Sequence, residues 1–411
     1  MGRYPSRSAR VAQLDRASVF GTDGWGFESL RARLLEPAAR DCILAVEKST
    51  AAASDRELAK AVERLSDLYT TRRGALNAEQ ADATFLVAKR EYFLASDAPK
   101  VAIALGECAV RSDAFARLAT LESVRVTDLG AGVGATSVGF IAWLAGERAR
   151  RGVTGAVRVH LHAVELGEPA ARAYESSVRQ AGAAAGVDVV LQIEARDFRR
   201  FTPPACDLIL CQTALNELLV GPEHARETVQ MVAGWARSAP LVVIEPALRT
   251  TTRALMAMRD SLLALGGSHV VAPCLHQKPC PMRAREGDWC HEARRSEPTP
   301  RVAAIDRIVG RRDERALFAY LATAPGDRAR AHPDTTVLLV TDTLGSRGKT
   351  ERLVCRGDGE MRLMRLLDRE VRDGNRAFLD AERGAAVEIT PLPANDRIAP
   401  ECAVHHIGRA D

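Results

Sequence analysis

Three cysteines lie close together in the segment "VAPCLHQKPCPMRAREGDWCH", residues 271–291. Cys274, Cys280 and Cys290 follow the spacing C-x5-C-x9-C, which lacks the C-x-x-C pairs typical of structural zinc sites. This spacing leaves three interpretations open: a structural metal site, free thiols in the core, or redox-active thiols. A metal site needs a fourth ligand, and Cys355 in the C-terminal part of the chain is the best candidate, ahead of the two histidines of the segment.

A second candidate site is the glycine-rich turn "DLGAGVG", which follows an apolar strand and precedes a long helix. Its three glycines allow the backbone to approach a ligand closely, and the start of the helix offers unpaired N–H groups. The spacing G-x-G-x-G lacks the Lys-Ser/Thr of a phosphate-binding loop and differs from the G-x-G-x-x-G of dinucleotide enzymes. Alone, such a turn is also compatible with a tight strand-to-helix connection.

The turn resembles the first motif of S-adenosylmethionine-dependent methyltransferases, in which it wraps the methionine and ribose parts of the cofactor. Glu165 ends the next strand in "HAVEL", where the resemblance implies bonds to the ribose hydroxyls, and Asp197 follows the third strand in "EARDF", where related enzymes contact the adenine. An exposed loop acid is the alternative for Asp197. The cofactor residues implied are Asp128, Gly130, Gly132, Gly134, Glu165 and Asp197.

The fourth strand runs into "LCQTALNEL", at the edge where the transferred methyl group would point. The Asp/Asn-Pro-Pro-Tyr/Phe signature of amino-methylating enzymes is missing there. Cys211 is not preceded by the proline found in 5-methylcytosine enzymes, so we interpret it as a core residue. The sequence therefore assigns no catalytic residue.

The elements that must position these residues divide the chain into four parts. Residues 34–121 show helical periodicity and predict a helical N-terminal domain. Strands alternate with helices over 122–272, which predicts an α/β fold with a Rossmann-like methyltransferase sheet. Residues 273–411 are expected to form a cysteine-bearing, β-rich C-terminal region, although "RRDERALFAYLATA" predicts a helix within it.

Residues 1–33 form the fourth part, because "VAQLDRASVFGTDGWGFESLRA" resembles a translated transfer-RNA gene. We expect this stretch to be spurious or disordered.

The composition is that of a soluble globular protein, with 46% hydrophobic and 27% charged residues over 411 positions. No apolar run is long enough for a membrane helix. A net charge of +4 is too small to indicate nucleic-acid binding by itself. Seven arginines between 294 and 315 favour either phosphate contact or a solvated helix face.

The series "DLGAGVG", "LNEL", "VVIEP", "VVAPCLHQKPCPM" and "DWCH", with a late cysteine on a β segment, resembles the ribosomal small-subunit Rsm-type methyltransferase-like family. Its members are mitochondrial small-subunit assembly factors with bacterial relatives. The resemblance implies that Cys274, Cys280, Cys290 and Cys355 hold a 4Fe–4S cluster, with zinc as the alternative metal. The chain departs from the family where Ala247-Leu248 replaces Gly-Thr.

We therefore expect a monomeric protein of the bacterial cytoplasm that binds S-adenosylmethionine and acts in small ribosomal subunit assembly or translation through contact with rRNA. The first alternative is an active rRNA methyltransferase. The second is a small-molecule methyltransferase with a structural zinc site.

Overall fold

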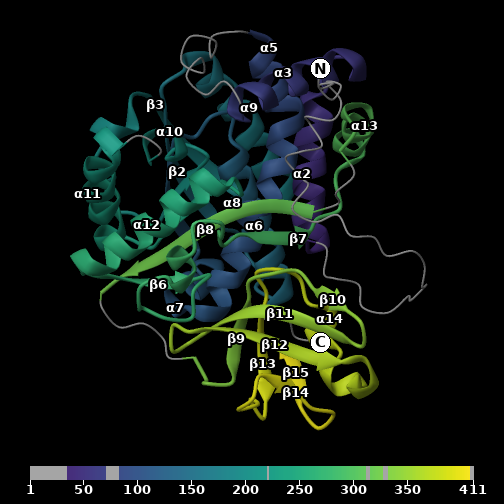
Figure 1. Cartoon of the computed structure of the whole chain (residues 1–411). Coiled ribbons are helices and arrows are strands. Elements are labelled where there is room, and N and C mark those ends of the chain that lie inside the picture. The colour runs from purple at the N-terminus through teal and green to yellow at the C-terminus, as the bar shows by residue number, and fades with distance from the viewer. Residues whose placement is uncertain (1–34, 71–82, 220–221, 312–314, 327–331, 408–411) are drawn as a thin grey trace, which may run out of the picture.

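The computed structural model describes residues 35–70, 83–219, 222–311, 315–326 and 332–407, so the predicted first part, 1–33, lies outside the described residues. Two β-sheets dominate these residues (Figure 1). The first is packed between helices, and the second, drawn in yellow-green, lies below it and contains the last of the described strands.

The first sheet has the strand order β3-β2-β1-β4-β5-β8-β6, with β7 also paired to β8. Strands β1 to β5 are parallel to one another, whereas β8 is antiparallel to β5, β6 and β7. The strands are β1 Ser123–Leu129, β2 Arg158–Glu165, β3 Asp188–Ala195, β4 Leu208–Gln212, β5 Leu241–Pro246, β6 Ser268–Ala272, β7 Glu292–Arg295 and β8 Arg315–Pro325. Helix-linked parallel strands whose order reverses beside β1 form the predicted Rossmann-like methyltransferase sheet.

Strand β8 corrects one prediction, because the sequence there was expected to form a helix. The run "ALFAYLATA" consists largely of alanine and leucine, which favour helices in isolation. In the structure it is buried along almost its whole length between β5 on one side and β6 and β7 on the other. A strand covered on both faces loses its alternating pattern, so periodicity could not distinguish it from a buried helix.

Helices cover both faces of the first sheet. The helices of the N-terminal part are α2 Pro37–Thr50, α3 Asp55–Thr70, α5 Ala83–Ala88, the π-helical turn η3 Lys89–Phe93, α6 Leu94–Arg111 and α7 Asp113–Ala116. Those that follow are α8 Ala135–Arg150, α9 Glu168–Ala185, α10 Asn216–Leu219, α11 Pro222–Ser238, α12 Arg249–Leu265 and α13 Pro300–Val309. Apolar residues of α2, α3 and α6 form one buried cluster with β1, β2 and α8. The N-terminal helices thus share a hydrophobic core with the sheet, and α11 and α12 cover its other face.

The second sheet confirms the β-rich C-terminal region. Its strand order is β14-β12-β11-β9-β13-β15, with β10 paired to β11. The elements are β9 Thr336–Leu339, β10 Leu344–Ser346, β11 Lys349–Arg356, β12 Met361–Leu367, β13 Ala386–Thr390, β14 Arg397–Ile398, β15 Ala403–His406 and the short helix α14 Ala377–Asp380. One face encloses its own apolar cluster, whereas the other packs against α12 and the cysteine-bearing loop 273–291.

Candidate functional site

A cavity of about 610 Å³ opens at the carboxyl ends of β1, β2, β4 and β5. We call it the cofactor cavity. Its walls are the glycine turn at the start of α8, the loops after β2 and β3, the end of β4, and residues from α3, η3 and α6. Ligands of open α/β sheets bind at this position, beside the point where the strand order reverses.

The glycine turn brings bare backbone to the wall of the cofactor cavity. Gly130, Gly132 and Gly134 have φ angles of +70°, +53° and +100°, which side-chain-bearing residues rarely adopt. A Cβ on Gly130 would lie 2.6 Å from the Cβ of Ala214, so the turn also requires glycine for space. Gly130 and Gly132 line the cavity, whereas Gly134 packs against Tyr174 and caps α8.

Asp128 lies behind the turn and outside the cavity wall. Its carboxylate is fully buried and accepts a hydrogen bond of 2.6 Å from the Ser137 hydroxyl at the start of α8. Oδ1 has no partner among the described residues. Burial raises the pKa of Asp128 to about 7, although the bond from Ser137 acts in the opposite direction. This geometry makes Asp128 a residue that fixes the turn to the helix.

The two downstream acids both line the cofactor cavity. Glu165 accepts hydrogen bonds from the N–H groups of Gly132, at 2.8 Å, and Gly167, at 2.9 Å, so it joins the glycine turn to the end of β2. Asp197 is held by the guanidinium group of Arg199, which lowers the pKa of its carboxyl group. Four of the six expected cofactor residues, namely Gly130, Gly132, Glu165 and Asp197, therefore meet at one cavity.

The end of β4 forms the part of the cavity where a methyl acceptor is expected. Thr213 has a φ of +55°, a strained conformation for a β-branched residue. Beside it, the fully buried Glu245 accepts hydrogen bonds from the backbone and side-chain N–H groups of Asn216. Cys211 is buried in the apolar cluster on the other side of the strand, which confirms its interpretation as a core residue.

The N-terminal helices supply a cavity wall that the sequence analysis missed. Lys89 and Phe93 from the π-helical turn, and Asp97 and Lys100 from α6, all line the cofactor cavity. Lys100 and Asp97 form an ion pair of 2.6 Å. Single-turn π-helices often occur at functional sites. No motif marks these residues, because only the packing of α6 on α8 brings them to the sheet.

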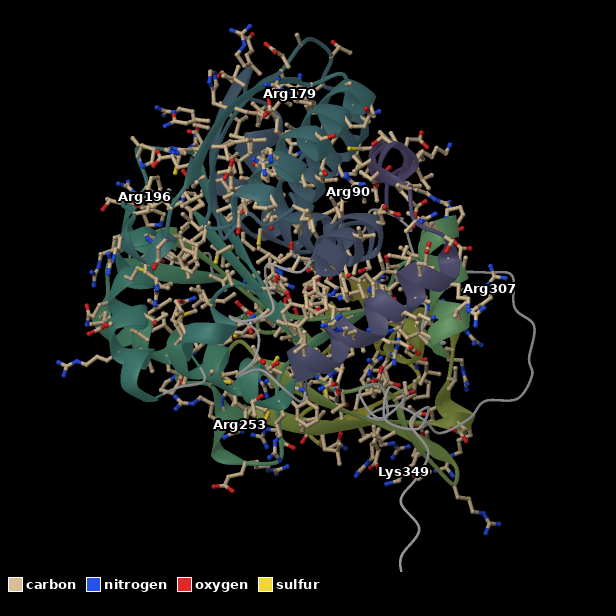
Figure 2. The ribbon with its side chains drawn as sticks, turned by 90° about the horizontal axis from the view of Figure 1, so that it is seen from above. Arg90, Arg179, Arg196, Arg253, Arg307 and Lys349 are labelled. Carbon is tan, nitrogen blue, oxygen red and sulfur yellow. The ribbon has the colours of Figure 1, made fainter. Side chains whose placement is uncertain are left out.

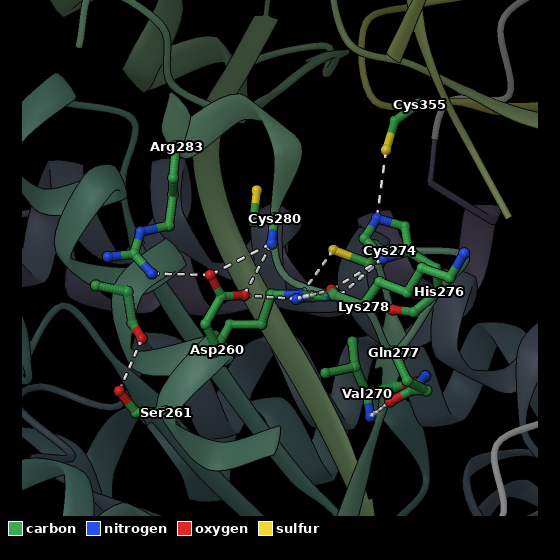
Figure 3. A network of polar contacts seen from close by, with 12 residues as sticks. Asp260, Ser261, Val270, Cys274, His276, Gln277, Lys278, Cys280, Arg283 and Cys355 are labelled. Atoms are coloured by element: carbon green, nitrogen blue, oxygen red, sulfur yellow. Dashed lines mark hydrogen bonds and ion pairs between the residues drawn. The ribbon is translucent and has the colours of Figure 1, made fainter. Parts of the chain in front are cut away.

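The four predicted ligands line a second cavity, between α12, β8 and the second sheet, which we call the cysteine cavity. In Figure 3 the sulfur atoms of Cys274, Cys280 and Cys355 point toward a common region, and Cys290 lines the same cavity. Burial raises the pKa of the Cys280 thiol to about 11. Within the described ranges, no group of three or more His, Cys, Asp or Glu side chains is arranged to hold a metal ion as it stands.

Arginine side chains hold the cysteine-bearing loop by its carbonyl oxygens. The buried Arg259 donates to the carbonyls of His276, at 2.6 Å, and Lys278, at 2.8 Å, and its Nε lies 3.2 Å from the sulfur of Cys274. Three further arginines each bind at least one loop carbonyl; they are Arg111, Arg253 and Arg383. A loop with little regular structure is thereby fixed around the cavity.

The chemistry of this donor set fits an iron–sulfur cluster. Four thiols from two distant segments surround one cavity, and a buried guanidinium group beside Cys274 would offset the negative charge of bound thiolates. Burial lowers the pKa of His276 to about 4, so this ring is neutral beside Cys355, from whose sulfur its Nε2 lies 3.5 Å away.

A hydrogen bond connects the cysteine-bearing loop to the wall of the cofactor cavity. Trp289, next to Cys290, donates from its ring N–H to the carbonyl of Ala247 at 3.1 Å. Pro246 and Leu248, on either side of Ala247, line the cofactor cavity. Ala247, where the chain departs from the family pattern, is therefore contacted by the cysteine-bearing loop.

The arginine-rich segment 294–315 is mostly engaged inside the molecule. Arg294 is buried and pairs with Glu292 and Glu107, and Arg301 pairs with the buried Glu91. Arg311 binds Tyr92 and Ser66, Arg315 pairs with Asp342, and Arg312 lies outside the described residues. The exposed members are Arg295 and Arg307, of which Arg307 lies at the outer edge of the molecule in Figure 2. Neither predicted role therefore fits the segment as a whole.

Along the described helices, none is long and apolar enough to cross a membrane.

Several solved structures are similar to this chain. A class I S-adenosylmethionine-dependent methyltransferase from Listeria monocytogenes matches at 12% identity and a TM-score of 0.34, over 68% of this chain and 71% of that one. A methyltransferase from Geobacter sulfurreducens in complex with S-adenosyl-L-homocysteine matches at 13% identity and a TM-score of 0.29, over 55% and 91%. Human N-acetylserotonin methyltransferase in complex with its cofactor matches at 13% identity and a TM-score of 0.26, over 44% and 42%. No curated protein matches the chain.

The family comparison agrees with the order of motifs along the chain. A model described as mitochondrial small ribosomal subunit Rsm22 matches residues 94–384, which include the glycine turn, the end of β4 and all four cysteines of the cysteine cavity. The match covers well over half of the chain, which therefore belongs to the Rsm22 family, a methyltransferase-like family.

Proposed function

We propose that this protein binds S-adenosylmethionine in the cofactor cavity, carries a 4Fe–4S cluster on Cys274, Cys280, Cys290 and Cys355, and acts on the small ribosomal subunit through contact with its RNA. The observation that carries the proposal is the convergence of the four cysteines on one cavity, although 65 positions separate the third from the fourth. The family description supports the ribosomal partner.

The geometry of the glycine turn supports cofactor binding. Gly130 and Gly132 leave room for the cofactor against the backbone, and Glu165 is already oriented by two backbone N–H groups toward the same cavity. Isothermal titration with S-adenosylmethionine tests this part. Binding should weaken at least tenfold in Glu165→Gln and stay unchanged in Glu175→Gln, an exposed glutamate on α9. Equal affinities in all three proteins would refute the assignment.

Metal content and ribosome binding test the rest of the proposal. Protein purified without oxygen should contain about four iron atoms and show the broad visible absorption of an iron–sulfur cluster. Sedimentation with purified small subunits should retain it in the ribosomal fraction. A colourless protein with stoichiometric zinc would remove the cluster, and a protein that stays in the supernatant would remove the partner.

Methyl transfer to ribosomal RNA is a second candidate function, favoured by the strained Thr213 at the acceptor end of the cavity. Strain of this kind persists where the surrounding structure holds it, often at active sites. Incubation of immature small subunits with methyl-labelled cofactor tests this function. Label should enter the RNA with the wild-type protein and not with Asp128→Ala, and absence of label in both reactions would leave a binding role alone.

A further inference from the structure

The walls of the cysteine cavity offer hydrogen-bond donors that the protein itself does not use. Building on the iron–sulfur site proposed above, we infer that one face of α12 and the open edge of β8 donate hydrogen bonds to the sulfur atoms of the cluster and raise its reduction potential. Thr252 is the central residue of this inference.

One face of α12 runs along the cavity. Thr252, Leu255, Met256 and Arg259 all line it, at the spacing of three, four and seven residues that places side chains on one side of a helix. Arg259 already approaches the sulfur of Cys274 at 3.2 Å. Thr252 lies two turns nearer the start of the helix, about 10 Å away along the axis. The same face therefore presents donors at two ends of the cavity.

The hydroxyl group of Thr252 has no partner among the described residues, although the side chain is 1% exposed. A helical threonine commonly donates to the carbonyl four residues earlier, but the Thr252 hydroxyl does not make this bond, and the carbonyl of Leu248 accepts only the backbone N–H of Thr252 among the described residues. Leaving a buried hydroxyl unpaired costs about 1–3 kcal/mol. Because the Thr252 hydroxyl is kept unpaired beside the cysteine cavity despite this cost in stability, it is available to donate a hydrogen bond to a ligand bound there.

The sheet also leaves backbone groups facing this cavity. Strand β6 pairs with residues 322–325 of β8, and β7 pairs with residues 315–318 on the same side. Among the described strands, residues 319–321 pair only with β5 on the opposite side, and all three line the cysteine cavity. The loop 273–291 leaves the sheet at the end of β6 and returns at β7. The part of the β8 edge without a partner strand, residues 319–321, therefore lies beside the cysteines of this loop.

These donors act on a site whose charge changes on reduction. When a reductant such as dithionite supplies one electron, the 4Fe–4S core changes from a charge of about 2+ to 1+, so a cluster with four thiolates becomes more negative. Hydrogen bonds to sulfur and the buried guanidinium of Arg259 stabilise the more negative state and therefore favour reduction. Asp260 opposes this effect only weakly, because it pairs with Arg259 and Arg283.

Thr252→Val removes the hydroxyl and keeps the shape of the side chain, and Thr252→Ser restores the hydroxyl. The full-length proteins are loaded without oxygen and titrated with dithionite and redox mediators while the reduced cluster is followed by electron paramagnetic resonance. At the wild-type midpoint, the ratio of reduced to oxidised cluster should fall about tenfold in Thr252→Val, a shift of about 59 mV for one electron. Thr252→Ser should match the wild type.

The outcomes separate this inference from the function on which it rests. A fully iron-loaded Thr252→Val with the wild-type midpoint overturns the inference alone, whereas zinc in place of iron in the wild type overturns the cluster as well. A second measurement needs no variant. Pulsed resonance of the reduced wild-type protein should detect exchangeable protons close to the cluster that disappear in heavy water, and their absence would also overturn the inference.

Discussion

Asp128 allows a pH-dependent test of the geometry behind the glycine turn. We expect the free energy of unfolding of the wild-type protein, measured relative to Asp128→Asn, to fall as the pH rises. Burial raises the pKa of this carboxyl from 3.8 to about 7 in the folded protein. Between these values the folded state holds a proton that the unfolded chain has lost, so the stabilisation is fully present below the lower value and is lost as pH rises through about 7.

The magnitude follows from the size of the shift. A difference of about three pKa units corresponds to about 4 kcal/mol. From about pH 5.5 to pH 8, where the protein can be handled easily, the wild type should lose about 2 kcal/mol of this stabilisation. Asparagine does not titrate, and its use as the reference cancels the contributions of other groups that titrate alike in both proteins.

The assay is denaturant unfolding of both ligand-free proteins at a series of pH values. Ser137→Ala serves as a further variant, because it removes the hydrogen bond that stabilises the charged carboxylate and should make the loss with pH larger. A difference between wild type and Asp128→Asn that stays constant from about pH 5.5 to pH 8 would refute the reasoning. It would mean that water or a cation reaches the carboxylate.

Four further changes test other parts of the structure. Gly130→Ala should destabilise the protein by more than Gly152→Ala in denaturant unfolding and abolish cofactor binding, because both have positive φ but only Gly130 also lacks space. Glu245→Gln should lose about 1–3 kcal/mol of stability, since an amide cannot accept all of the bonds that Leu215 and Asn216 donate to the carboxylate. Trp289→Phe should cost about 1 kcal/mol and weaken cofactor binding in calorimetry, through the lost bond to Ala247. Arg301→Gln should cost about 2 kcal/mol by removing the closer of the arginines beside the buried Glu91, which keeps Arg90 at 3.5 Å, whereas the exposed Arg307→Gln should change stability by less than about 0.5 kcal/mol.

The strand, turn and helix that form one wall of the cofactor cavity could be predicted from the sequence, because the residues that specify them are neighbours in the chain. Strand β1, the glycine turn and the start of α8 lie within one continuous stretch, and the positive φ angles require the glycines that the motif contains. Glu165 and Asp197 were predicted in the same way, from the ends of successive parallel strands, and both line the cavity, whereas their contact with a cofactor stays a prediction. The wall built by Lys89 and Lys100 left no such signal, since it depends on how separate helices pack.

The arginine-rich segment shows why charge counting did not predict a surface. Arg294 pairs with the neighbouring Glu292 and also with Glu107, 187 positions earlier in the chain, and Arg301 pairs with Glu91, 210 positions earlier. A local stretch of sequence around this segment shows the seven arginines and Glu292, but neither Glu107 nor Glu91. The same run of arginines can therefore indicate two different things. Buried arginines are paired with acids inside the protein, whereas exposed arginines remain available to bind phosphate groups. The segment thus serves mainly to attach α13 and β7 to the N-terminal helices.

The residues between Glu245 and Arg259 belong to both candidate sites. Glu245 orders the acceptor end of the cofactor cavity through Asn216, and the peptide at Ala247 receives the bond from Trp289. Two residues further, α12 begins and carries the cavity-lining face that ends at Arg259. Because strand and helix are continuous here, the hydrogen bond from Trp289 attaches the cysteine-bearing loop to the same stretch of chain that lines the cofactor cavity. Any effect of cluster loading on cofactor affinity must then be matched by an equal effect of the cofactor on the cluster site, since the coupling of two binding equilibria is reciprocal.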